Sequence, residues 1–307
     1  MDNFVHINAN TRYCGLLGYP VRHSASPSFQ NAALSFLHLN WRYLAMEVHP
    51  KSLFHAIEGA KSMGFIGLNL TVPHKETGFK LANKVNPTAQ ILGAINTICF
   101  EGLNKDGEWL PIRNWKNDSP VEVRSVGYNT DSDAIPASLK ENFGFVSAQK
   151  SILILGAGGA GRVAALRLSA EGAKKIYIIN RTVQKAENLA EEIHSHYPGT
   201  KVILQYPDPS EKVDLILNAT SLGLKSSDPI PLDINQFSMR QAKYAFDMIY
   251  RPAETPFLTM ARQSGCQIAN GINMLLYQGA ASLELWTGLP APIEIMRKAL
   301  IENIYHN

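Results

Sequence analysis

A glycine-rich turn in the middle of the chain constrains the fold most strongly. The apolar run 151–155 is followed by GAGGAG at residues 156–161 and then by an alanine-rich segment that favours helix from Arg162 to about Glu171. The order strand, G-x-G-x-x-G, helix is typical of dinucleotide-binding units, in which the glycines permit a tight turn, a nearby pyrophosphate and close helix packing. The helix N-terminus adds free N–H groups and a positive dipole end. A nucleotide site is therefore predicted, with an ordinary structural turn as the alternative.

The end of the next predicted strand indicates which nucleotide is bound. NAD sites usually carry an acidic residue there, which accepts hydrogen bonds from the ribose. In this chain residues 179–182 read Ile-Asn-Arg-Thr, so the strand end has no acid, and Lys185 follows one helical turn later. Arg181 suits a 2′-phosphate, because a guanidinium can pair with it bidentately. We expect NADP rather than NAD. The alternative, two solvated cations at a helix start, is slightly disfavoured by the helix dipole.

Strand and helix signals alternate along both halves of the chain. Helices are expected to start near Pro27, Pro50 and Pro73, and the 307 residues suit two domains at roughly 100–200 residues each. This alternation predicts an α/β protein with largely parallel sheets. Residues 101–120 are polar and rich in turn formers, which predicts a long hairpin or surface excursion. The predicted strands are 13–18, 41–48, 65–70, 95–100, 121–126, 151–155, 175–180, 202–204, 213–218, 244–249 and 267–269.

Three polar clusters follow predicted strands of the first half, where open α/β sheets place their ligands. They are GYPVRHSASP at residues 18–27, NLTVPHK at 69–75 and GYNTD at 127–131. Hydroxyls of Ser24 and Ser26 before a helix start can bind a carboxylate, and Ser26 could equally cap the helix. Taken singly, Lys75 is expected to be a surface lysine and Asp131 a helix cap.

Charge, hydropathy and cysteine spacing exclude several classes of function. The formal charge is +3, from 29 basic and 26 acidic residues, so we expect no nucleic-acid partner. No run approaches the ~20 apolar residues of a membrane span, and the first residues do not resemble a signal peptide. The three cysteines, at positions 14, 99 and 266, are too far apart for a metal or redox motif, so reduced thiols, no metal and a cytoplasmic location are expected.

In combination, these motifs resemble the shikimate dehydrogenase family, and the resemblance covers nearly the whole chain. The segments that carry it are, in order, HSASPS, NLTVPHK, LGAINT, GYNTD, GAGGAGR, NRT, ILNATSLG, FDMIY and NGINMLLYQGA. The resemblance implies an NADP-dependent oxidoreductase that interconverts 3-dehydroshikimate and shikimate. It also implies a substrate domain at residues 1–130 and 271–307, a Rossmann domain at 131–270, and a cleft between the two.

The resemblance also assigns roles to single residues. Lys75 and Asp131 would form the catalytic pair. An ammonium beside the reacting ketone oxygen stabilises the negative charge that hydride transfer builds there, and a neighbouring carboxylate keeps the lysine charged. Substrate would be held by Ser24, Ser26, Thr71, Asn96, Tyr250 and Gln278, with Asp131 also contacting it. The cofactor would be held by Gly156, Gly158, Gly159, Asn180, Arg181, Thr182, Lys185 and Gly271.

The sequence departs from the family pattern in four places. Gln30 stands where histidine is usual, Ser132 and Asn273 stand where glycine is usual, and the segment between Phe100 and Val121 is long. Three alternatives stay open: a quinate or quinate/shikimate dehydrogenase using NAD or NADP, a non-catalytic sensor of the same metabolites, and a folate-linked dehydrogenase. The serine motif disfavours the last. The expected partner is a small-molecule substrate, with no membrane or nucleic acid, and the protein is either a monomer or a homodimer.

Overall fold

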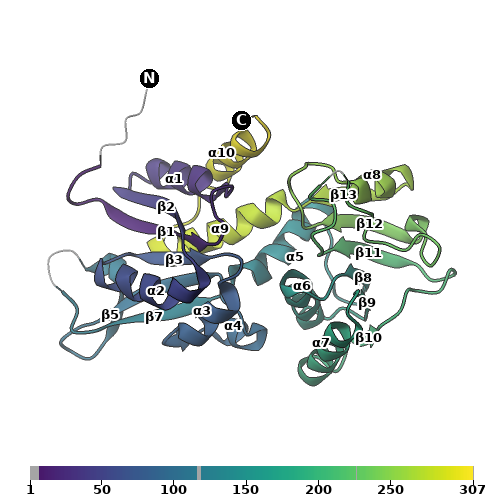
Figure 1. Ribbon diagram of the computed structural model, residues 1–307, viewed down its shortest axis with the longest axis horizontal. Coiled ribbons are helices and arrows are strands. Elements are labelled where there is room, and N and C mark those ends of the chain that lie inside the picture. The colour runs from purple at the N-terminus through teal and green to yellow at the C-terminus, as the bar shows by residue number, and fades with distance from the viewer. Residues whose placement is uncertain (1–6, 116–118, 226, 307) are drawn as a thin grey trace. The chain divides into compact units, whose positions relative to one another are not determined.

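The chain forms two compact units (Figure 1). The first unit comprises Met1–Thr130 and Leu276–Asn307, and the second unit comprises Asp131–Leu275. Helices α5 (Thr130–Phe143) and α9 (Ile272–Thr287) lie where the chain passes from one unit to the other. The computed structural model describes residues 7–115, 119–225 and 227–306.

The first unit contains a mixed sheet with the strand order β2-β1-β3-β5-β7-β4, and β6 pairs with β5. Helices α1 and α10 pack against each other, and α1 also packs on β2. The strands are β1 (Arg12–Gly18), β2 (Trp41–Glu47), β3 (Gly67–Leu70), β4 (Lys84–Val85), β5 (Thr97–Leu103), β6 (Trp109–Pro111) and β7 (Val123–Tyr128). The helices are α1 (Ser26–Phe36), α2 (Leu53–Ser62), α3 (Lys75–Leu81), α4 (Pro87–Leu92) and α10 (Ile293–Tyr305).

The expectation of a largely parallel sheet is wrong for the middle of the first unit. Strand β5 runs antiparallel to β3, β6 and β7. For β6 and β7 the physical reason is the connection from β5 to β7, which among its described residues contains β6 and a short 3-10 turn but no crossover helix. Parallel neighbours need such a crossover, whereas antiparallel neighbours can be joined without one. The pairs of β1 with β2 and with β3 are parallel as expected, and β4, a short strand that the sequence analysis did not predict, is parallel to β7.

This topology brings several polar segments to one edge of the sheet. Leu17 of β1 is in register with Leu70 of β3, and Thr97 of β5 is in register with Asn69 of β3 and Tyr128 of β7. The carboxyl ends of β1, β3 and β7 and the amino end of β5 therefore meet at this edge. The serine, lysine and asparagine motifs all follow or precede these strand ends.

The excursion between β5 and β7 is anchored to two other parts of the first unit. The Arg12 guanidinium donates hydrogen bonds to the carbonyl oxygens of Ile112 (2.6 Å) and Arg113 (2.9 Å). Arg113 in turn donates to the carbonyls of Leu285 (3.0 Å) and Trp286 (3.3 Å) in the last turn of α9. A cation at a helix C-terminus satisfies carbonyls that lack a partner within the helix. Through Arg113, the excursion thus anchors the C-terminal end of α9.

The second unit contains a fully parallel sheet with the strand order β10-β9-β8-β11-β12-β13. Helix α6 packs on β8, α7 packs on β10, and α8 packs on β12 and β13. The strands are β8 (Ser151–Leu155), β9 (Lys175–Ile179), β10 (Lys201–Ile203), β11 (Val213–Asn218), β12 (Ala242–Asp247) and β13 (Gln267–Asn270). The helices are α6 (Gly159–Ala170), α7 (Val183–His196) and α8 (Pro256–Gln263).

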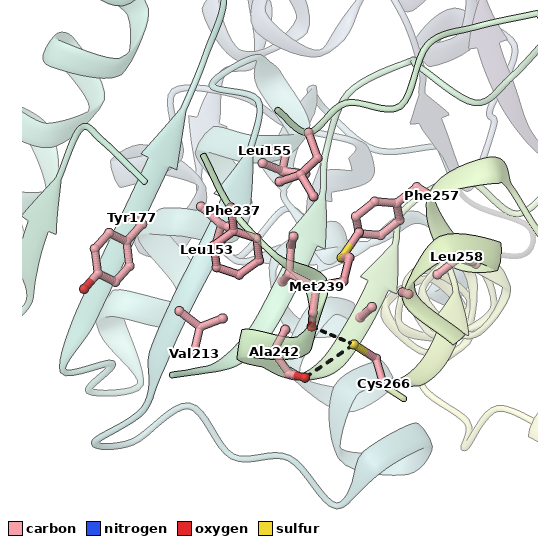
Figure 2. Packing of buried hydrophobic residues seen from close by; sticks show 14 residues of the cluster. Leu153, Leu155, Tyr177, Val213, Phe237, Met239, Ala242, Phe257, Leu258 and Cys266 are labelled. Atoms are coloured by element: carbon pink, nitrogen blue, oxygen red, sulfur yellow. Dashed lines mark hydrogen bonds between the residues drawn. The ribbon is translucent and has the colours of Figure 1, made fainter. Parts of the chain in front are cut away.

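One apolar cluster fills the space between this sheet and α8 (Figure 2). Phe237 and Phe257 are each 1% exposed within it, and Leu153 and Leu155 supply the β8 side. The Cys266 thiol lies in the same cluster, where its Sγ contacts the carbonyl oxygens of Met239 and Ala242, both at 3.3 Å. Burial raises the pKa of Cys266. All three cysteines are free thiols. Within the described parts of the chain, no helix is long and apolar enough to cross a membrane.

Candidate active site

The glycine turn of the second unit has the geometry that its sequence predicts. Gly156 has φ +105°, a conformation that L side chains rarely adopt. A Cβ on Gly161 would lie 1.9 Å from the Gly156 carbonyl oxygen, so only glycine lets α6 approach β8 this closely. Around Gly158 and Gly159 an added Cβ would meet nothing within 4 Å, which leaves open space at the start of α6.

A cavity of about 670 Å³ opens beside this turn. Six of the eight predicted cofactor residues line it: Gly156, Gly158, Asn180, Arg181, Thr182 and Lys185. Two cations therefore face the same space as the glycine turn, which suits a ligand that carries more than one phosphate. Asp233 lines the cavity as well, and hydrogen bonds from Gln236 and Asn235 lower the pKa of its carboxyl group.

Asn180 links the glycine turn to the segment that carries the cations. Its Oδ1 accepts a hydrogen bond from the Ala157 backbone N–H at 2.8 Å, and its Nδ2 donates to the Thr182 carbonyl at 2.7 Å. An acid at this position could accept the first bond but could not donate the second. The asparagine thus fixes the local backbone at the position where an NAD site has its carboxylate.

The loop after β11, which belongs to the motif ILNATSLG, contributes to the site although none of its residues was predicted to do so. Ala219, Thr220, Ser221 and Leu222 line the cavity, together with residues 230–233. The loop is held by Asn218, whose Oδ1 accepts from the Thr220 N–H (3.0 Å) and the Thr220 hydroxyl (2.8 Å). The available signal was the pair of hydroxyl residues Thr220 and Ser221, two and three positions after the end of a buried parallel strand, because the carboxyl ends of such strands are the usual ligand edge of the sheet.

A buried carboxylate supports the same loop from the neighbouring strand. Asp247, at the end of β12, is fully buried and accepts hydrogen bonds from Thr255 (2.6 Å), Asn218 (3.0 Å) and the Ile249 N–H (3.0 Å). Burial raises its pKa despite these bonds, which favour the ionised form. Tyr250 follows directly after Ile249 and is half-buried, whereas Gly271 lies between β13 and α9 and does not line the cavity.

In the first unit, the serine segment folds back on itself after β1. The Ser24 hydroxyl oxygen accepts a hydrogen bond from the Ser26 N–H at 3.2 Å. Helix α1 begins at Ser26, and its N-cap position, Ala25, makes no side-chain cap. Ser26 therefore does not act as the N-cap. Its side chain is instead hydrogen-bonded to the hydroxyl group of Tyr43.

The lysine motif lies on the next strand of the same sheet. The Thr71 N–H donates to the Leu17 carbonyl at 2.9 Å, so this residue follows β3 directly beside the end of β1. Lys75 is the first residue of α3 and is half-buried, and its carbonyl oxygen accepts from the Ile95 N–H at 3.1 Å. This backbone bond fixes the start of α3 next to the residue that precedes Asn96.

Asn96 lies at the centre of the polar edge and is only 2% exposed. Its Oδ1 accepts from the Thr130 backbone N–H at 2.8 Å and from the Thr97 hydroxyl at 3.0 Å. Its Nδ2 contacts the Thr130 hydroxyl at 3.0 Å and Gln278 Oε1 at 3.5 Å. The structure thus brings together two residues, Asn96 and Gln278, that are 182 positions apart in the sequence and that were both predicted to bind substrate.

Asp131 lies in the first turn of α5, directly after Thr130, whose N–H is bound to Asn96. Lys75 belongs to the first unit and Asp131 to the second. The first unit also contains Ser24, Ser26, Thr71, Asn96 and Gln278. The second unit contains Tyr250 and all eight predicted cofactor residues.

Models of three domain families match the chain in order. The shikimate dehydrogenase substrate-binding domain matches residues 16–98, the shikimate/quinate 5-dehydrogenase domain matches 138–229, and the shikimate 5′-dehydrogenase C-terminal domain matches 271–301. The first and second of these matches fall on the lysine motif and on the glycine turn, respectively.

Complete proteins give the same result. An NADP(+) shikimate dehydrogenase of Geobacter metallireducens is 38% identical over 96% of this chain and 98% of its own. A crystal structure of a shikimate dehydrogenase in complex with NADP+ has a TM-score of 0.83 and 35% identity, and covers 97% of this chain and 98% of its own. A Thermus thermophilus enzyme solved with NADP(H) and shikimate has a TM-score of 0.77 and 33% identity, covering 95% and 99%. Since these similarities extend over nearly the whole length, the chain belongs to the shikimate dehydrogenase family.

Proposed function

We propose that this chain catalyses the reversible, NADP-dependent reduction of 3-dehydroshikimate to shikimate. The observation that carries the proposal is the cavity of the second unit, where the glycine turn, Arg181 and Lys185 face one space. Two cations and an open helix N-terminus match a pyrophosphate and a 2′-phosphate in the same ligand. The NADP(+) shikimate dehydrogenases that are similar over nearly the whole chain support the same reaction.

Residues 1–130 and 271–307 are the proposed substrate-binding and catalytic domain. Residues 131–270 are the proposed dinucleotide-binding domain. Ser24, Ser26, Thr71, Asn96, Tyr250 and Gln278 are the proposed substrate ligands. When bound, NADPH would donate the hydride for the reduction, and NADP+ would accept it in the reverse direction. Gly156, Gly158, Gly159, Asn180, Arg181, Thr182, Lys185 and Gly271 are the residues that would hold it.

Lys75 and Asp131 are the proposed catalytic pair. When the ketone is reduced, negative charge develops on its oxygen, and the Lys75 ammonium stabilises that charge and delivers the proton that completes the hydroxyl group. In the reverse direction the neutral amine of Lys75 accepts the proton from the hydroxyl. The Asp131 carboxylate is the proposed partner of Lys75 and binds a neighbouring hydroxyl of the substrate.

A product analysis tests the proposed function directly. The purified chain is incubated with shikimate and NADP, and both products are quantified. The proposal predicts NADPH and 3-dehydroshikimate in a one-to-one ratio, because one hydride leaves each molecule of shikimate. Binding of both compounds without formation of either product would contradict the proposal and favour a non-catalytic sensor.

A further inference from the structure

A buried hydrogen-bond network lies behind the polar edge of the first unit. It joins Tyr43 of β2, Asn69 of β3, Thr97 of β5 and Ser282 of α9, none of which is more than 5% exposed. Asn69 Nδ2 lies 3.0 Å from the Thr97 hydroxyl and 3.0 Å from the Ser282 hydroxyl, which are themselves 2.8 Å apart. Four elements distant in the sequence thus share one polar cluster in the interior.

Two backbone groups fix the direction of the hydrogen bonds in this cluster. The Asn96 carbonyl oxygen can only accept, and Asn69 Nδ2 donates to it at 3.0 Å. The Asn69 Oδ1 must then face the other way, where it accepts from the Tyr43 hydroxyl at 2.8 Å. Because Tyr43 has one hydroxyl proton, its oxygen is left as the acceptor for Ser26.

The second fixed group is the Thr130 backbone N–H, which can only donate. It is 2.8 Å from Asn96 Oδ1, so the side-chain amide of Asn96 cannot be flipped without a buried donor-to-donor contact. The Thr97 hydroxyl, which lies 3.0 Å from the same oxygen and 2.8 Å from the Ser282 hydroxyl, can donate its single proton to either of them. The Asn96 side chain is therefore oriented with its Nδ2, a pure donor, toward Gln278.

Ser282 connects the cluster to the second predicted amide ligand. Its hydroxyl donates to the Gln278 carbonyl at 2.9 Å, one turn earlier in α9, and lies 3.2 Å from the Thr130 hydroxyl. The backbone of Gln278 is thus fixed relative to the start of β5, which directly follows Asn96. Polar groups buried this deeply are costly to leave unpaired, so the network resists alternative arrangements.

We propose that Thr97, Ser282, Asn69 and Tyr43 are positioning residues that orient Asn96 and Gln278. One amide N–H of Asn96 is held by the Thr130 hydroxyl, and the other, which faces Gln278 at 3.5 Å, is presented to an oxygen atom of the substrate. This inference rests on the proposed function, since shikimate is the substrate concerned. None of the four positioning residues is required to touch it. The network matters because a preoriented donor binds without first breaking a competing arrangement.

Steady-state kinetics of four variants test this inference. Thr97→Val and Ser282→Ala remove single hydroxyls from the network, and we expect each to raise the KM for shikimate about threefold to tenfold, the effect of one lost hydrogen bond. Asn96→Asp keeps the acceptor for Thr130 and Thr97 but replaces the donor, and should raise this KM at least about tenfold. In all three variants the KM for NADP should stay unchanged.

Thr287→Val is the matched control. Its hydroxyl also donates to a carbonyl one turn earlier in α9, that of Leu283 at 2.8 Å, but it lies outside the network. Thermal unfolding midpoints accompany all measurements, because a merely destabilised variant loses active protein and therefore kcat, but not affinity for shikimate. If Ser282→Ala does not fold, the KM of the nearly isosteric Thr97→Val variant for shikimate decides whether the network has a positioning role.

The possible results separate the two claims. If Thr97→Val and Ser282→Ala bind shikimate as well as Thr287→Val does, the positioning role is wrong. If Asn96→Asp binds shikimate like the wild type, the assignment of Asn96 as a donor is wrong. Absence of shikimate turnover by the wild type would instead contradict the proposed function itself.

Discussion

The polar edge of the first unit and the cavity of the second unit are built in different ways. Around Asn96, side chains from several strands and helices are tied to one another in the interior, and Asn96 itself is 2% exposed. Around the glycine turn, backbone geometry creates an open space of about 670 Å³, with Arg181 exposed beside it. The first site therefore depends on the polarity of buried side chains. The second depends on how closely two backbone segments approach.

The largest expected effect is on kcat at Lys75, and it should leave cofactor binding unchanged. Lys75→Ala should lower kcat about 10²–10⁴-fold, because a proton-transfer group is lost, while affinity for NADP stays unchanged. Lys80→Ala, an exposed lysine of the same helix α3, is the control and should keep full activity. Initial rates measure kcat, and a fluorescence titration with NADPH measures the affinity for the cofactor. Unchanged turnover in Lys75→Ala would remove this residue from the mechanism.

The next effect concerns the backbone of the second unit. Gly161→Ala places a Cβ 1.9 Å from the Gly156 carbonyl oxygen, so α6 must move away from β8. We expect a loss of about 2–4 kcal/mol in the free energy of unfolding, with loss of NADP binding. Gly159→Ala, which meets no atom within 4 Å, should change stability by less than about 1 kcal/mol. Denaturant unfolding compares the two, and equal losses would contradict the close-approach argument.

A smaller and more selective effect is expected at the cations. Arg181→Ala should weaken NADP binding by about 1.5–3 kcal/mol, the range for hydrogen bonds to a charged group. Binding of NAD, which lacks the 2′-phosphate, should change little. Calorimetric titrations with each cofactor measure the difference. An equal loss for both cofactors would show that Arg181 does not recognise the 2′-phosphate.

The excursion between β5 and β7 should contribute to stability more than to catalysis. Arg113→Met keeps the aliphatic stem but removes the donors to Leu285 and Trp286, and we expect a cost of about 1–2 kcal/mol in the free energy of unfolding. Lys105→Met, at an exposed position of the same excursion, serves as the control. If both variants unfold at the same denaturant concentration, Arg113 does not stabilise the end of α9.

The smallest effect is a pH dependence in the first unit. His74 is 1% exposed, and burial lowers its pKa, although a hydrogen bond to the Val48 carbonyl opposes this. The unfolded chain therefore binds the proton more tightly, and stability is lost as pH falls from the unfolded value of about 6.5 toward the lower folded value. The advantage of wild type over His74→Gln in the free energy of unfolding should shrink across this range. If the difference in free energy of unfolding between wild type and His74→Gln stays constant with pH, the lowered pKa of His74 is contradicted.

Sequence reasoning succeeded where the determinants are local. The glycine turn requires particular residues within six positions, and Arg181 and Lys185 follow the next strand, so the cavity of the second unit could be predicted. The reversed direction of β5 relative to β7 could not, because it depends on a pairing between two strands that are separated by the turn-rich residues 104–122. The roles of Tyr43 and Ser282 were also missed, since a tyrosine in a strand and a serine in a helix carry no local signal of a shared buried network.

Four rates of the wild-type chain decide whether the proposed reaction is correct: those with shikimate and with quinate, each in the presence of NADP and of NAD. We predict that shikimate with NADP gives the highest kcat/KM, because the two cations suit a 2′-phosphate. A higher kcat/KM with quinate and NAD would identify a quinate dehydrogenase instead. Failure of shikimate to react with either cofactor would contradict the proposed function.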